Sequence, residues 1–294
     1  MKFANLHLHS IYSDGAQTPD ELFTKAKEMG YGALAITDHN TVTGWDDFKD
    51  KAQKHNMDYI LGMEANGILN DGNLHFVCFD FDITDTKVAN YLKYHHEIMH
   101  VNAKAKFDSL IKNKLIPEIT WQNVLDDCGG NVWMCNEQIF YSLVKRTEMT
   151  QADYRQYFLA FRAAPVEESQ KIIYDSAENV IKMIRNAGGV IGLAHPYRIT
   201  KYLDELYKIG MNAVEYDHPD IDEEDIKAVL EFAKDKKIYM CGGTDHTGQL
   251  SNYPNEREKD PEDRDPCFLV PLTTDVRNGV TKEEFYNLKN RIYG

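Results

Sequence analysis

The chain has 294 residues, of which 43% are hydrophobic and 27% are charged, a composition typical of a globular protein. Its formal net charge is −14, from 33 Lys and Arg residues against 47 Asp and Glu residues. A surface of this charge repels a phosphate backbone, so we expect no long nucleic acid as a partner. A small anionic substrate remains compatible with it, because bound cations dominate the potential of their own pocket.

The five cysteines stand at irregular spacings and form no Cys-x-x-Cys pair, which indicates reduced thiols rather than disulfides or a thiolate zinc site. No apolar run reaches the length of a membrane span, and the first residues lack the apolar segment of a signal peptide. We therefore expect a cytoplasmic protein without a membrane partner. The length fits one α/β barrel, with or without an inserted domain.

The first fifteen residues predict a short strand that ends in metal-type side chains. Alternation along a strand sends His7 and His9 to the same face, so their imidazoles converge at its end. Asp14 follows in the turn Ser13-Asp14-Gly15, which can fold back over the strand end. This arrangement favours metal ligands, although a strand with two surface histidines has the same pattern.

A β-α unit and a second strand follow. Thr18-Pro19-Asp20-Glu21 is a capping box at the start of a helix that stops at Gly30. Residues 33–37 form a continuous apolar run, as in a buried parallel strand. The run leads directly to His39, so a second strand also ends near a histidine.

Two further apolar runs predict strands over residues 58–63 and 75–79. The first ends at Glu64, whereas the second begins at His75. His75 therefore stands at a strand start, unless the boundary lies one residue off.

From about residue 84 to residue 175, helical patterns replace the strand patterns. We expect an all-helical subdomain over residues 85–175, inserted into a barrel that comprises residues 1–84 and 176–294.

Strand patterns resume at residues 190–194, 213–216 and 238–242. The first of these leads to His195 and the last to Asp245. The total of seven strands, nearly all separated by helices, predicts an α/β fold with a seven-stranded TIM-like (β/α)7 barrel.

In such barrels the C-terminal ends of the strands form the active site. Metal-type side chains stand at these ends: His7, His9, His39, Glu64, His195 and Asp245, with His75 nearby. This coincidence indicates a site for more than one metal ion.

Several short motifs carry a family pattern, in this order: His7-Leu8-His9 with Ser13-Asp14-Gly15, Thr37-Asp38-His39, Gly62-Met63-Glu64, the later His75, Ala194-His195-Pro196 and Gly242-Gly243-Thr244-Asp245. The pattern resembles that of the polymerase and histidinol phosphatase (PHP) superfamily. The resemblance implies a distorted seven-stranded barrel, two to three divalent ions (manganese, zinc or iron) and hydrolysis of phosphate esters. The insertion resembles that of a subgroup acting on nucleoside monophosphates or nucleotide bisphosphates, where it caps the site.

The resemblance also implies a set of metal ligands. The first ion takes His7, His9, Glu64 and Asp245; the second takes His75, His195 and a bridging Glu64; the third takes Asp14 and His39. The family's last motif reads Asp-x-His, whereas this chain has Asp245-His246-Thr247. The third ion therefore either takes His246 from a shifted loop or lacks that ligand. Asp38 is expected to orient a neighbouring imidazole.

On the substrate side, the resemblance implies phosphate contacts from Arg198, whose guanidinium offers a bidentate fork, and from His218. Asp245 or His218 is expected to assist proton transfer to the leaving group. The Arg-Pro-His motif of those relatives is replaced here by residues 136–138, Asn-Glu-Gln. The expected enzyme is a metal-dependent phosphomonoesterase for a small, nucleotide-like phosphorylated substrate, in which a metal-bound hydroxide attacks phosphorus.

Two other functions fit parts of the sequence. Residues 96–100 read His-Glu-Ile-Met-His, the zinc-peptidase pattern, but no third ligand follows, so we interpret it as an exposed helix face. The missing Arg-Pro-His motif is compatible with a catalytically weak protein that binds or senses a ligand. We interpret His95 as a helix-surface residue and Trp133 as a packing residue.

Overall fold

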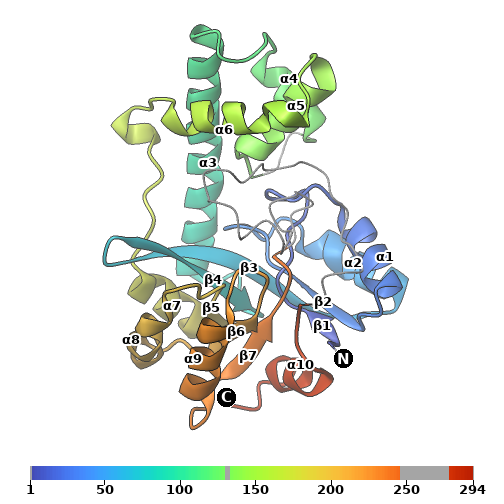
Figure 1. Ribbon diagram of the computed structural model, residues 1–294, viewed down its shortest axis with the longest axis vertical. Coiled ribbons are helices and arrows are strands. Elements are labelled where there is room, and N and C mark those ends of the chain that lie inside the picture. Colours follow the sequence, from blue (N-terminus) through green and yellow to red (C-terminus); the bar gives the residue numbers. More distant parts are fainter. Residues whose placement is uncertain (1, 130–132, 246–277, 294) are drawn as a thin grey trace.

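The computed structural model describes residues 2–129, 133–245 and 278–293. Within these residues a seven-stranded sheet follows the order of the chain, as the sequence predicts (Figure 1). The strands are β1 (Ala4–Asn5), β2 (Ala33–Ile36), β3 (Asp58–Leu69), β4 (Gly72–Phe79), β5 (Val190–Leu193), β6 (Ala213–Asp217) and β7 (Tyr239–Gly242). Together with its helices, the sheet gives the expected α/β barrel.

The helices fall into two groups. Those connecting or flanking the strands are α1 (Pro19–Glu28), α2 (Trp45–His55), α7 (Ala177–Asn186), α8 (Leu203–Ile209), α9 (Glu223–Ala233) and α10 (Lys282–Lys289), with the short 3-10 helix η3 (Thr200–Tyr202). The others are α3 (Thr86–Lys112), α4 (Trp121–Asp127), α5 (Asn136–Arg146) and α6 (Tyr154–Ala163), with η1 (Gln151–Asp153) and η2 (Glu168–Gln170). The expected capping box of α1 is present, because Thr18 and Glu21 exchange hydrogen bonds.

Strand β4 departs from the (β/α)7 pattern. It runs antiparallel to both β3 and β5, whereas the other neighbouring pairs are parallel. Only Asn70 and Asp71 separate β3 from β4, which is enough for a hairpin but far too short for a helical crossover. The start of β4 therefore lies at the same edge of the sheet as the ends of its neighbours.

The barrel closes where β1 meets the end of β7, and the side chain of Asn5 makes the closure. Its Oδ1 accepts hydrogen bonds from the backbone N–H groups of His7 (3.2 Å) and Thr244 (3.1 Å), and its Nδ2 donates to Thr244 Oγ1 at 2.8 Å. Backbone bonds from Leu6 to Gly242 and from Asp245 to His7 flank this contact. Asn5 is fully buried, so no water can replace these partners.

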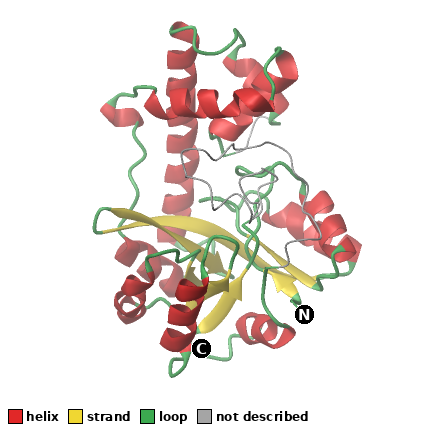
Figure 2. Ribbon diagram, viewed as in Figure 1, coloured by secondary structure: helices red, strands yellow, loops and turns green. Residues whose placement is uncertain are grey.

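Between β4 and β5, every regular element that the structure describes is helical (Figure 2). α3 leads from the sheet to the helices α4 to α6, which pack with it around a hydrophobic cluster of their own. The side chain of Gln138, on α5, donates to the backbone carbonyl of Ser13 beside the barrel's first turn. That residues 85–175 form a separate subdomain stays a prediction. Within the described residues, no helix has the length and apolar character that a membrane span requires.

The Asn5 closure generates a stability prediction. Asn5→Leu keeps the volume but leaves two backbone N–H groups and the Thr244 hydroxyl without partners, so it should lower the free energy of unfolding by about 2–4 kcal/mol. Gln156→Leu, at an exposed position of α6, should change it by less than about 0.5 kcal/mol. Urea unfolding followed by circular dichroism measures both values. Equal stabilities of the two variants would contradict the assigned role of Asn5.

Candidate metal centre

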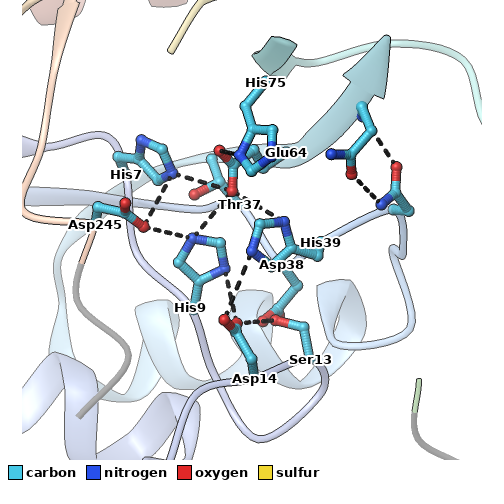
Figure 3. Close-up of polar contacts among 12 residues, drawn as sticks. His7, His9, Ser13, Asp14, Thr37, Asp38, His39, Glu64, His75 and Asp245 are labelled. Carbon is cyan, nitrogen blue, oxygen red and sulfur yellow. Dashed lines mark hydrogen bonds and ion pairs between the residues drawn. The ribbon is translucent and has the colours of Figure 1, made fainter. Parts of the chain in front are cut away.

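The segment after β1 brings His7 and His9 to the interior, with their ring centroids 5.2 Å apart (Figure 3). His7 Nδ1 donates to Glu215 Oε1 at 3.0 Å, which leaves the lone pair on His7 Nε2. Burial lowers the pKa of His7, but Glu215, Asp245 and Glu64 outweigh burial and raise it well above its usual value. The surrounding carboxylates therefore favour a positive charge at this point.

Glu215 is a site residue that we did not identify in the sequence. It lies in β6, fully buried, and its second oxygen accepts from the backbone N–H of His195 at 2.7 Å. One carboxylate thus orients two candidate ligands, His7 and His195. A signal was present, because a glutamate inside the apolar run Ala213–Tyr216 needs a buried partner.

Glu64, at the point where β3 passes the site, is the centre of the cluster. Its carboxylate is 1% exposed, and five imidazoles surround it. Oε2 lies 3.4 Å from His7 Nε2, 3.3 Å from His9 Nε2 and 3.0 Å from His39 Nδ1, and Oε1 lies 2.9 Å from His75 Nδ1 and 3.1 Å from His195 Nε2. Burial raises the pKa of Glu64, but the imidazoles, His39 first among them, lower it well below its usual value.

Asp14 reaches the cluster from the turn after β1. Its carboxylate lies 3.3 Å from His9 Nδ1 and 3.6 Å from His39 Nε2. The turn is tight enough that a Cβ on Gly15 would stand 2.5 Å from the backbone carbon of His9, so only glycine fits there.

Asp38 has a different role from the one expected. Its carboxylate accepts from the backbone N–H and the hydroxyl of Ser10 and from the hydroxyl of Ser13, at 2.6–2.8 Å. It therefore supports the turn that carries Asp14, and no hydrogen bond joins it to the imidazole that it was expected to orient in the part of the chain that the structure describes.

His75 joins the cluster because β4 is antiparallel. A residue near the start of this strand lies at the edge where the neighbouring strands end, so no boundary shift is needed. His195, just after β5, has φ +27°, a backbone conformation that non-glycine residues rarely adopt. Burial lowers the pKa of His195, but the hydrogen bond that its ring donates to Glu64 and the nearby carboxylates raise it to about 9.

Asp245 follows β7 and also has a positive φ, +50°. Its Oδ1 lies 2.9 Å from His9 Nε2 and 3.4 Å from His7 Nε2, and its Oδ2 lies 3.5 Å from His218 Nε2. His218 Nδ1 accepts from the backbone N–H of Asp220 at 2.8 Å. A neutral imidazole that accepts through Nδ1 carries its proton on Nε2, so His218 is a donor toward the cluster.

The donor atoms fit divalent metal ions. Within the described chain, five groups of potential ligand atoms lie within 4.8 Å of one another. Three share members around Glu64: His7, His9, Glu64 and Asp245; His9, Asp14 and His39; His39, Glu64 and His75. The other two contain His218: His7, Glu215 and His218; His218, Asp220 and Asp245. The ring nitrogens His7 Nε2, His9 Nδ1 and His9 Nε2 and the oxygen Glu64 Oε2 are buried without a hydrogen bond. Each such atom costs about 1–3 kcal/mol when left unpaired, and a coordinated cation removes that cost.

Arg198, a predicted phosphate contact, is not among the residues of this cluster. Arg198 binds the Asp225 carboxylate through its backbone N–H, and its guanidinium lies 4.7 Å from the centre of the Tyr197 ring. Phosphate contact by Arg198 stays a prediction. His246 falls outside the described residues.

The zinc-peptidase pattern on α3 gains no third ligand, because none of the candidate metal groups among the described residues includes His96 or His100. Instead the His100 ring packs edge-on against Trp121. His95 is 1% exposed, so its interpretation as a surface residue is wrong. Trp133 packs as expected, and its ring also stacks on His39 with centroids 5.8 Å apart.

Comparisons with known proteins agree with this geometry. A phosphoribosyl 1,2-cyclic phosphate 1,2-diphosphodiesterase from Eggerthella lenta is 22% identical over 85% of this chain and 96% of its own length. A 5'-3' exoribonuclease from Haemophilus influenzae is 26% identical over 66% of this chain and 69% of its own length. The crystal structure of a proposed metal-dependent phosphoesterase from Bifidobacterium adolescentis has the same fold, with a TM-score of 0.76 over 99% of this chain and 96% of that one, at 22% identity. The PHP domain family matches residues 5–209, and the chain belongs to this family.

Proposed function

We propose that the protein is a phosphomonoesterase that uses two to three divalent ions of manganese, zinc or iron to release phosphate from a small substrate. Its broader class, a metal-dependent hydrolase of phosphoric ester bonds, follows from the family match and from the phosphodiesterase relative. The carrying observation is the set of overlapping ligand groups around Glu64. Neighbouring cations in such groups activate water and neutralise phosphoryl oxygens.

The chain's own residues orient the candidate ligands and place an N–H donor beside them. Glu215 fixes the ring of His7, and the Ser10–Ser13 turn, supported by Asp38, fixes Asp14. His218 directs its Nε2–H toward Asp245 and the cluster, so it is placed to donate a hydrogen bond to a phosphoryl oxygen. To transfer a proton to the departing oxygen, the ring would first take up a second proton at Nδ1 in place of the bond from Asp220.

Two pockets border the cluster and favour a small substrate. One, of about 440 Å³, is lined by His75, His195 and Tyr197. The other, of about 400 Å³, lies between Asp14 and α5 and is lined by Ile11, Tyr141 and Glu137. Both volumes are at the low end for small-molecule sites. Carboxylates rather than cations line the second pocket, which supports an uncharged leaving group over a second phosphate.

The residues that replace the Arg-Pro-His motif serve other contacts. Gln138 binds the Ser13 carbonyl, and the Glu137 carboxylate accepts from the Tyr154 hydroxyl at 2.8 Å. Burial and the nearby Asp14 raise the pKa of Glu137. This segment therefore supports the site's architecture and offers no cation to a distal phosphate.

Glu64→Gln tests the metal centre. Loss of the central negative charge should remove most bound metal and lower phosphate release by at least about 10³-fold, because metal loading and catalysis depend on the same carboxylate. Elemental analysis and a phosphate-release screen over nucleotides and sugar phosphates measure the two effects.

The matched control is Glu97→Gln, at the exposed acid of the zinc-peptidase pattern. It should leave metal content and phosphate release unchanged. Wild-type protein that binds metal but releases no phosphate from any substrate would refute the proposed function. Casein cleavage that disappears in Glu97→Gln would favour the peptidase.

His218→Asn tests the proton donor through the leaving group. For glycerol 2-phosphate, a poor leaving group, kcat should fall about 10²-fold or more, the usual contribution of general acid catalysis. For p-nitrophenyl phosphate, whose phenolate leaves without protonation, it should fall much less. Equal losses for the two substrates would assign His218 to phosphate binding alone.

A further inference from the structure

A third cavity lies away from the metal centre and is lined by the N-terminal half of α3, the segment 173–175 and α7. Figure 1 shows where these elements lie. We call it the α3–α7 cavity. Its volume is about 720 Å³, within the range of small-molecule sites. None of the candidate metal ligands lines it, and the proposed phosphoesterase activity does not use it.

The most informative residue of the cavity is His95. It is 1% exposed, its Nδ1 is buried without a partner, and the ring makes no hydrogen bond with any residue that the structure describes. Burial lowers its pKa to about 4, against the opposing effect of Asp175. At neutral pH the ring is therefore uncharged, with one donor and one acceptor to satisfy. Burying such a group unpaired is unfavourable, which a bound ligand would correct.

Three aromatic rings pack around His95 and also line the cavity. Tyr91 lies 4.3 Å from the imidazole centre, Tyr94 lies 5.2 Å away, edge-on, and Tyr174 stacks at 5.6 Å with an interplanar angle of 20°. Flat apolar faces of this kind favour a planar ring over a flexible chain.

The remaining polar lining indicates the substituents of that ring. The amides of Asn90 and Asn186 make no hydrogen bond within the described chain and can each donate and accept. Lys182 pairs with Glu178 on its own helix, whereas Lys87 has no ion pair with any described residue. The lining also holds the carboxylate of Asp175, which accepts from the Asn179 amide at 2.8 Å. An acidic group of a ligand would therefore pair with Lys87.

We propose that the α3–α7 cavity is a second ligand site that binds a planar nitrogen heterocycle carrying one acidic group. The heterocycle's ring edge pairs with His95 and the asparagine amides, its faces pack on the tyrosines, and its acidic group meets Lys87.

Isothermal titration calorimetry of the full, metal-loaded chain tests this assignment. The probes are orotate, nicotinate and urate, none of which is a phosphate ester, and saturating inorganic phosphate occupies the metal centre. At least one probe should bind with one site per chain. His95→Phe, which keeps the ring and removes its hydrogen bonds, should weaken binding about tenfold or more, and Lys87→Met should weaken it severalfold.

Two controls lie on the same helix: His96→Phe and Lys93→Met should bind like the wild type. Lys87 is exposed, so its variant stays informative if His95→Phe does not fold. The proposal is overturned if no probe binds, or if both cavity variants bind like the wild type. Binding that disappears in Glu64→Gln but persists in Lys87→Met would assign the probes to the metal centre and also overturn it. Phosphate release is assayed separately, so failure of the proposed phosphoesterase function is distinguishable from failure of ligand binding in the α3–α7 cavity.

Discussion

The carboxylate of Glu64, enclosed by five imidazoles, is the interaction on which the rest of the site depends. A carboxylate this deeply buried is unfavourable unless positive charge surrounds it. The imidazoles come from the segments that follow β1, β2 and β5 and from the start of β4, so their positions are fixed only when those strands are in register. The strand register that forms the barrel therefore also determines the geometry of the site.

The meeting of most candidate metal ligands at one edge of the sheet could be predicted from the sequence. Parallel strands in a barrel end at one rim, so His7, His39 and Glu64, each at the end of an apolar run, were expected to meet. The case of His75 shows the limit of the argument. The sequence places His75 near the other ligands, but it does so without identifying the reason, which is that β4 runs antiparallel to β3. The two-residue gap after Leu69 indicates this reversal, because it is too short for a helical crossover.

The unpredicted features share a physical cause, which is that they depend on neighbours distant in the chain. Glu215 is a strand residue whose partners, His7 and His195, become apparent only when β6 lies beside them. The Asp38 carboxylate accepts hydrogen bonds from Ser10 and Ser13 rather than from an imidazole, because the turn that carries these serines folds onto it. His95 is buried because Tyr174, almost eighty positions later, covers it. Periodicity identifies the inner face of an element but not what packs there.

The closure through Asn5 has a consequence for synthesis on the ribosome. β1 pairs with β2 early, but Thr244 and Asp245, its partners on the other side, emerge only after more than two hundred further residues. Until then His7 and His9 lack their last carboxylate and the barrel stays open on one side. The nascent chain therefore carries two metal-type histidines next to an incomplete sheet until residue 245 has been synthesised, and the complete set of candidate ligands cannot form before that point.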